Sequence, residues 1–262
     1  MKILFGLVVL AAASGVAQEN PAAPEVALSV SGMGDGLTAK GWPLTIAVTI
    51  VSDDGRRVSA GLVDKTWPAA VKLEIRNSDG ELLDWPLRLI SALPETLSIV
   101  GQDSAIAVYA LAPEFTAVLA EGRYSVRASL DTTTGAESWS WVGLVQSGLA
   151  PLNLIAEPDP LTKDQEATKY LLLADYEEGN GNVEGALQQL DLLLEKQPDQ
   201  LAAVTARADL FMTAERWADA LAEYQRAIRI ARRLRPDPSH PPAELMRRQT
   251  LAATKLAAQE KP

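Results

Sequence analysis

Two stretches in the second half of the chain, 183–199 (VEGALQQLDLLLEKQPD) and 216–230 (RWADALAEYQRAIRI), share one alternation of small and bulky residues. A shift of 34 residues places Ala174 on Ala208, Ala186 on Ala220, Leu190 on Tyr224 and Leu193 on Ala227. Small side chains at such positions let two antiparallel helices pack closely, whereas larger ones would push them apart. The match indicates that the two stretches are the second helices of a repeated helical hairpin.

A helical hairpin that repeats every 34 residues resembles the tetratricopeptide repeat family. The first unit, about 167–200, matches the family pattern at Tyr170, Leu173, Ala174, Ala186, Leu190 and Pro198. The second, about 201–234, matches at Ala208, Phe211, Ala220, Tyr224 and Ala227. Arg232 stands where proline is usual, so we expect the last helix of this unit to extend to Leu234. Because two units make a poor core, a capping helix over 242–259 is expected to cover the open end; the alternatives are a partner or a second copy of the chain.

The resemblance implies a concave face, lined by the first helix of each unit, that binds a peptide of a partner protein. The residues at these positions are Thr168, Leu171, Asp175, Glu178, Thr205, Asp209 and Met212. Asp175 and Asp209 stand where the carboxylate-clamp members of the family have asparagine, and we expect no lysine or arginine to support them. An acidic groove of this kind would suit a basic or mixed segment rather than a free C-terminus. The alternative is that these residues are merely solvated.

The first half of the chain has the pattern of short strands. Apolar residues alternate with smaller ones over 44–50, 71–75 and 124–130, and a period of two indicates strands with one buried face. Asp54-Gly55 and Asp79-Gly80 suit tight hairpin turns. The segment 122–126 (GRYSV) resembles the late strand of immunoglobulin-like modules. We therefore predict a multidomain protein, all-β then all-α: an antiparallel immunoglobulin-like sandwich over 26–147, a linker over 148–161 and a helical domain over 162–259. Thr162 to Gln165 fits a capping box at the start of the helical domain.

Three tryptophans of this half precede proline, at Trp42, Trp67 and Trp85. A residue before proline favours extended geometry, so Trp-Pro is a natural entry to a strand with the indole closing one end of the sandwich. The rival hypothesis is an aromatic platform for sugar rings, joined by Trp139 and Trp141. Buried indoles would argue against that platform, and a flat exposed row would favour it.

The first residues have the pattern of an export signal. Lys2 precedes an apolar run over 3–13, and small residues at Gly15 and Ala17 suit a signal peptidase. The run is short for a membrane-spanning helix. We predict a signal peptide over 1–17, a flexible mature N-terminus over 18–25, a periplasmic or secreted bacterial protein, and no stable membrane insertion after cleavage. The alternative is a retained N-terminal anchor.

The inventory of catalytic residues is thin. The chain has no cysteine, and its one histidine, His240, lies in a proline-rich connector, so we expect no metal, no cofactor and no nucleophilic triad. A carboxylate-pair hydrolase stays open as a weaker alternative, because such pairs come from distant positions. A net charge of -10 at pH 7 argues against nucleic-acid binding.

Charge is uneven along the helical half. Residues 151–200 carry eleven acids against three lysines, whereas residues 201–250 carry nine arginines against six acids. Arg226, Arg229 and Arg233 form a stripe near a helix C-terminus, with Arg232 and Arg235 beside it. We interpret them as a solvated helix end, and a head-to-tail homo-oligomer remains open.

The leading functional hypothesis is a non-enzymatic exported adaptor or scaffold that recruits another envelope protein through the concave face. The rival is a carbohydrate-binding sandwich whose helical domain serves as a spacer or a dimer contact.

Overall fold

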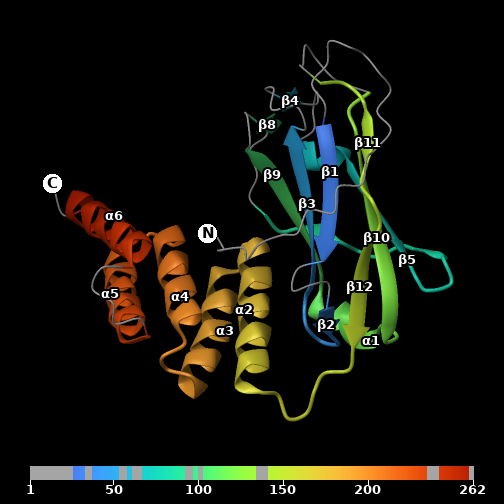
Figure 1. The fold of residues 1–262 in the computed structure, drawn as a ribbon. Helices are drawn as coiled ribbons and strands as arrows, with labels where there is room; N and C mark the ends of the chain where they lie inside the picture. The colour runs from blue at the N-terminus through green and yellow to red at the C-terminus, as the bar shows by residue number, and fades with distance from the viewer. Residues whose placement is uncertain are drawn as a thin grey trace. The chain divides into compact units, whose positions relative to one another are not determined.

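The computed structural model describes residues 26–32, 37–52, 58–60, 67–91, 97–99, 103–133, 141–234 and 242–259. The predicted signal peptide and mature N-terminus, Asp54-Gly55, Trp139 and His240 lie outside these residues. The described chain divides between Asp159 and Pro160 into a β unit and a helical unit (Figure 1).

The β unit consists of short strands, one 3-10 turn and one short helix. Its strands are β1 (Val26–Gly32), β2 (Leu37–Ala39), β3 (Leu44–Ser52), β4 (Val58–Ala60), β5 (Val71–Arg76), β6 (Leu82–Leu83), β7 (Arg88–Leu89), β8 (Leu97–Ile99), β9 (Ser104–Leu111), β10 (Gly122–Asp131), β11 (Leu144–Gln146) and β12 (Ala150–Ile155). The turn η1 (Trp67–Ala70) precedes β5, and α1 (Pro113–Val118) connects β9 to β10.

Two sheets form the sandwich. One has the order β1-β3-β9-β7, and the other has the order β2-β12-β10-β5-β6, with β11 also paired to β10. This is the order A-B-E-D facing G-F-C that defines the immunoglobulin-like fold. Side chains of β1, β3 and β9 share one buried cluster with Ala128 and Leu130 of β10, so the sheets pack face to face. The predicted immunoglobulin-like sandwich is confirmed.

Tyr124 forms a structural corner where the chain enters β10. Its hydroxyl donates a hydrogen bond to the carbonyl of Ala120 at 2.6 Å, which is the tyrosine corner of immunoglobulin-like domains. Trp85 packs edge-on against the Tyr124 ring, with ring centroids 5.0 Å apart. The phenol is thereby held on both its polar and its apolar side, which fixes how β10 enters the sheet.

The hairpin predicted at Asp79-Gly80 joins β5 to β6. Gly80 has a φ of 83°, which L side chains rarely adopt, and its amide donates to the carbonyl of Asn77. The Asn77 side-chain oxygen accepts hydrogen bonds from the amides of Asp79 and Glu81. An asparagine placed before Asp-Gly therefore satisfies the amides that the turn leaves unpaired.

One prediction about the β unit is wrong. The segment 148–161 is not all linker, because β12 lies within it and pairs antiparallel with β10 from Ala150 to Leu154. The strand has only six residues and includes Pro151, so the apolar alternation was too short to predict it. The antiparallel sandwich contains one parallel pair, because β2 pairs parallel with β12 at the edge of its sheet.

The helical unit consists of α2 (Lys163–Gly179), α3 (Val183–Lys196), α4 (Leu201–Thr213), α5 (Trp217–Leu234) and α6 (Ala243–Gln259). The predicted capping box opens α2: Thr162 accepts from the amide of Gln165, whose side chain accepts from the amide of Thr162. The predicted end of α5 at Leu234 and the predicted helix over 242–259 are both confirmed within a residue.

The helices pack in sequence order, α2 on α3, α3 on α4, α4 on α5 and α5 on α6 (Figure 1). The paired alanines of the 34-residue shift, Ala174 with Ala208 and Ala186 with Ala220, are at most 3% exposed. On α4, Arg207 joins three helices, because its guanidinium pairs with Asp191 of α3 at 2.6 Å and with Glu223 of α5 at 2.9 Å. Small side chains set the distance between neighbouring helices, and Arg207 links α3 to α5 through two ion pairs.

Ala186→Leu tests the close approach of α2 and α3. Ala186 is fully buried, so we expect the larger side chain to lower the free energy of unfolding of the helical unit by about 1–3 kcal/mol. The measurement is urea unfolding followed by far-UV circular dichroism. Gln188→Leu, at an exposed position of the same helix, is the matched control. Equal losses in both variants would show that helix spacing does not depend on residue 186.

Candidate functional site

Two carboxylates of the predicted concave face lie close together on α2. Asp175 and Glu178 are three residues apart, which places them on one side of the helix, and both are half-buried. Burial, with the charge of nearby Glu178, raises the pKa of Asp175 to about 7. Burial also raises the pKa of Glu178, and the Asp209 carboxylate adds to that shift. No lysine or arginine of the described helical unit forms an ion pair with either group.

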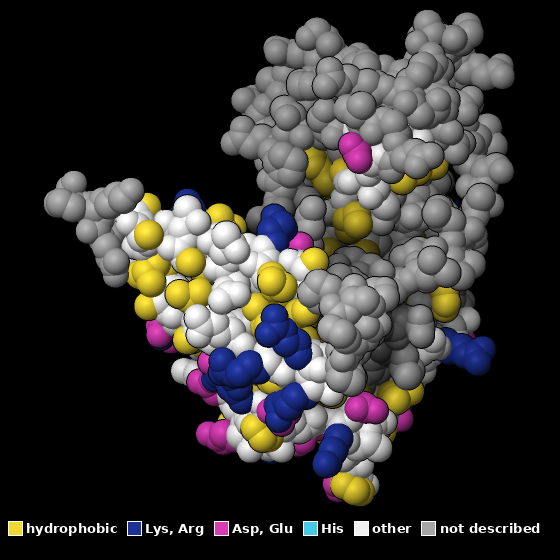
Figure 2. All heavy atoms as spheres, turned by 60° about the vertical axis from the view of Figure 1, so that its left-hand side comes forward, with side chains coloured by type: hydrophobic (Ala, Val, Ile, Leu, Met, Phe, Trp, Pro, Cys, Tyr) yellow, Lys and Arg dark blue, Asp and Glu magenta, His cyan; other side chains and the backbone are white. Residues whose placement is uncertain are grey.

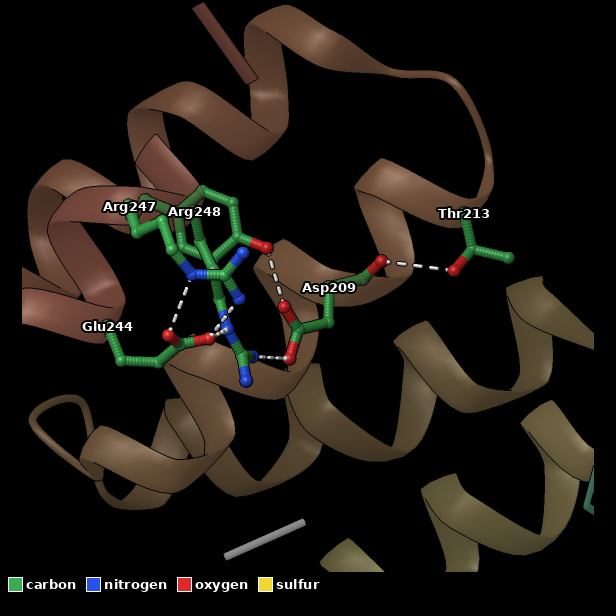
Figure 3. Close-up of polar contacts among 6 residues, drawn as sticks. Asp209, Thr213, Glu244, Arg247 and Arg248 are labelled. Atoms are coloured by element: carbon green, nitrogen blue, oxygen red, sulfur yellow. Dashed lines mark hydrogen bonds and ion pairs between the residues drawn. The ribbon is translucent and has the colours of Figure 1, made fainter. Parts of the chain in front are cut away.

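Asp209 of α4 belongs instead to an internal network. Its Oδ1 accepts a hydrogen bond from the hydroxyl of Tyr224 at 2.5 Å, and its Oδ2 pairs with Arg248 of α6 at 2.5 Å. Figure 3 shows Arg248 reaching Asp209 from the last helix, with Glu244 beside it. Burial and the bond to Asp209 raise the pKa of the Tyr224 phenol far above its ordinary value. The negative charge of Asp209 is therefore balanced by Arg248 within the protein.

Glu244 completes the network from the first turn of α6. It accepts hydrogen bonds from Arg247 at 2.8 and 2.9 Å and from Arg248 at 3.0 Å. These bonds lower the pKa of Glu244 to about 2. Arg248 is 16% exposed and has a carboxylate on each side, whereas Arg247 is 70% exposed and pairs, among the described residues, with Glu244 alone. Arg248 is thus the residue that fastens α6 to α4.

The remaining predicted groove residues have unequal roles. Leu171 packs against the buried cluster of α2, α3 and α4, and Met212 packs against the cluster formed by Ala208, Ala220, Tyr224 and Ala252. Thr168 is exposed and its hydroxyl donates to the carbonyl of Asp164 in its own helix, while Thr205 is half-buried. Leu171 and Met212 thus contribute to packing, and the side chains left for a partner are Thr168, Asp175, Glu178 and Thr205.

The expectation that no basic residue supports Asp175 and Asp209 is wrong for Asp209. Arg248 comes from the capping helix, which follows a proline-rich connector, so a 34-residue comparison does not reach it. The sequence did contain a weaker signal that Arg248 lies on the packed side of its helix. Arg248 precedes the buried Ala252 by four residues, as Val204 precedes Ala208 on α4 and Tyr170 precedes Ala174 on α2.

The tryptophans of the Trp-Pro pairs are structural. Trp42, Trp67 and Trp85 are 6%, 1% and 8% exposed, and Trp141 is also buried. The indole of Trp42 donates to Glu157 at 2.9 Å, and its carbonyl accepts from the Thr116 hydroxyl at 2.7 Å. Trp42-Pro43 directly precedes β3 as predicted, whereas Trp67-Pro68 begins η1 and Trp85-Pro86 lies between β6 and β7. These four indoles therefore present no exposed row for a sugar ring.

The described residues contain neither a metal-binding cluster nor a membrane-spanning helix. No three acidic or histidine side chains there come together in a way that would hold a metal ion. No helix of the described chain is both long enough and apolar enough to cross a bilayer.

Comparisons with known proteins show distant similarity in structure only. No family model matches the sequence, and no curated protein matches it. The CARDB domain of the PF1109 protein from Pyrococcus furiosus, solved with di-metal ions, aligns with 51% of this chain and 90% of its own at 14% identity and a TM-score of 0.28. The PapD-like domain 7 of human CEP192 aligns with 60% of this chain and 99% of its own at 8% identity and a TM-score of 0.31. Native alpha-2-macroglobulin from Escherichia coli aligns with 92% of this chain and 48% of its own at 11% identity and a TM-score of 0.31.

Arg248→Met tests the fastening of α6. The change leaves Asp209, whose side chain is 15% exposed, without its cation, so we expect the free energy of unfolding to fall by about 2–4 kcal/mol. Arg247→Met is the matched control, because its ion pair with Glu244 is exposed to solvent and we expect its loss to matter less. Urea unfolding at neutral pH measures both. A loss no larger for Arg248 than for Arg247 would contradict the network.

Proposed function

We propose that this chain is a non-enzymatic adaptor whose helical unit binds a basic or mixed segment of another protein along α2 and α4. The observation that carries the proposal is the pair Asp175 and Glu178, two half-buried carboxylates without a cationic partner in the described helical unit. Like charges held close together in a partly dry site are costly. A lysine or arginine from a partner would relieve that cost, which gives the face a preference for basic segments.

The proposed architecture of the binding unit is a short tetratricopeptide array. Two hairpins, α2–α3 and α4–α5, repeat their buried alanines at 34 residues, and α6 covers the end of the second hairpin through Arg248 and Ala252. In such an array the first helix of each hairpin faces the partner. This places α2 and α4 on the binding side, with Asp209 as an internal support rather than a contact.

We also propose that the protein acts outside the cytoplasm, in the periplasm or secreted. The support is the sequence of residues 1–17, which has the charge, apolar run and small residues of an export signal. The carbohydrate-binding alternative has lost its main support, since the indoles that would form the described part of the platform are buried. The carboxylate-hydrolase alternative stays the weaker proposal, because the two acids that lie close together, Asp175 and Glu178, are neighbours on one helix and do not face each other from distant positions.

The pH dependence of binding tests the role of Asp175. Because its pKa is about 7, Asp175 is mostly neutral at pH 6 and mostly charged at pH 8, while lysine stays charged throughout. We expect a fluorescein-labelled hexalysine peptide to bind about fivefold more tightly at pH 8 than at pH 6, since one further attraction is gained. Fluorescence anisotropy measures the dissociation constants.

Two variants distinguish the groove from the general acidity of the protein. Asp175→Asn/Glu178→Gln should weaken binding at pH 8 and flatten the pH profile. The matched control Glu184→Gln/Glu195→Gln removes two exposed carboxylates of α3 with the same change in net charge. Equal weakening by both double variants, or a profile that does not change with Asp175→Asn/Glu178→Gln, would refute the assigned face.

A further inference from the structure

A second charged surface lies at the C-terminal part of α5, where it meets the turn between α3 and α4. An open concavity of about 600 Å³ is lined there by Asp199, Arg226, Arg229, Ile230, Arg232 and Arg233. Four arginines within eight residues stand out in a chain whose net charge is -10. Figure 2 shows Lys and Arg side chains gathered on one face of the helical unit.

Two of the four arginines are held by the protein itself. Arg226 donates a hydrogen bond to the carbonyl of Pro198 in the α3–α4 turn, and its guanidinium lies 3.7 Å from Glu223. Arg233 pairs with Asp199 at 2.9 Å, and both side chains are 63% exposed. Buried Ile230, 2% exposed, supports the helix between them. These contacts fix the wall of the concavity before any ligand arrives.

The other two arginines are available. Arg229 and Arg232 are exposed, and neither forms an ion pair or hydrogen bond with another described residue. A guanidinium is always charged and presents paired N–H donors that match a carboxylate in a bidentate manner. Two such groups beside two positioned ones make a site for anionic groups rather than a merely solvated helix end.

Asp199 indicates which anion the concavity accepts. It is a carboxylate on a peptide chain, and it already binds one of the lining arginines within the concavity. A long polyanion such as a nucleic acid would meet the repulsion of a protein with ten excess negative charges, whereas a short acidic segment touches only the local basic surface. Charge complementarity therefore favours an acidic peptide.

We propose that this concavity is a docking site for an acidic peptide segment of a partner protein, bound through Arg229 and Arg232, with Asp199 as a built-in competitor for Arg233. The site is separate from the acidic face of α2 and has the opposite charge preference. The protein thus offers one surface to a basic segment and another to an acidic one.

The test uses the full chain and a fluorescein-labelled hexaglutamate peptide, with binding followed by fluorescence anisotropy at low ionic strength. Arg229→Glu/Arg232→Glu should weaken binding by at least about tenfold, because two charge-assisted contacts become repulsive. Asp199→Asn should strengthen it by about threefold, because Arg233 is released. The matched control Arg247→Glu/Lys255→Glu reverses two exposed cations of α6 with the same change in net charge, and should leave binding within about twofold.

Several outcomes would overturn the proposal. Equal weakening in the two double variants would show that the peptide responds to overall charge alone. Unchanged or weaker binding by Asp199→Asn would remove the competitor role. A single-stranded oligonucleotide that binds as tightly as the peptide would show a general polyanion surface. Far-UV circular dichroism checks folding, and Arg229→Gln/Arg232→Gln, which adds no negative charge, replaces the first variant if that variant is unfolded.

Discussion

The helical unit depends on the close approach of neighbouring helices at buried alanines. Ala186, Ala208, Ala220 and Ala252 have no exposed surface, and each lies where a larger side chain would separate two helices. This spacing decides which polar contacts can form between the helices. It lets Arg207 span from Asp191 to Glu223, and it brings Arg248 of α6 within hydrogen-bond distance of Asp209 on α4. Polar contacts between helices are thus a consequence of apolar packing.

The Asp209 network shows how one carboxylate can change from a binding group to a structural one. A half-buried acid needs a counter-charge, and α6 supplies it through Arg248, with the Tyr224 hydroxyl as a second donor. Asp175 of α2 stands 34 residues before Asp209, at the equivalent position. The helix that corresponds to α6 for this residue is α4, and α4 brings no arginine to Asp175. Asp175 on α2 therefore remains available to a partner, whereas Asp209 at the same position on α4 is already paired within the protein.

The sequence was most informative where a period extends over many residues. The alanine pairs, the capping box at Thr162 and the alternating residues of β3 and β10 each predicted the element that the structure contains. Prediction failed where the signal was short or came from elsewhere in the chain. The six residues of β12, which include Pro151, have too few alternations to reveal a strand, and the parallel pairing of β2 depends on that hidden strand. Arg248 escaped because its connector breaks the 34-residue spacing, and no local pattern says which distant carboxylate an arginine will meet.

Charge separation within the helical unit has a physical rationale that links both proposed surfaces. Acids are concentrated on α2 and α3, whereas arginines are concentrated on the C-terminal part of α5, where the carbonyl end of the helix favours cations. Arginines at that end stabilise α5 without any partner, so their position does not lower the stability of the fold. Placing Asp175 and Glu178 together on α2 has the opposite effect, because burial and the charge of Glu178 both raise the pKa of Asp175. The two surfaces therefore indicate a partner in different ways. The acidic face does so through the raised pKa of Asp175, and the basic concavity does so through its free arginines and the carboxylate it already holds.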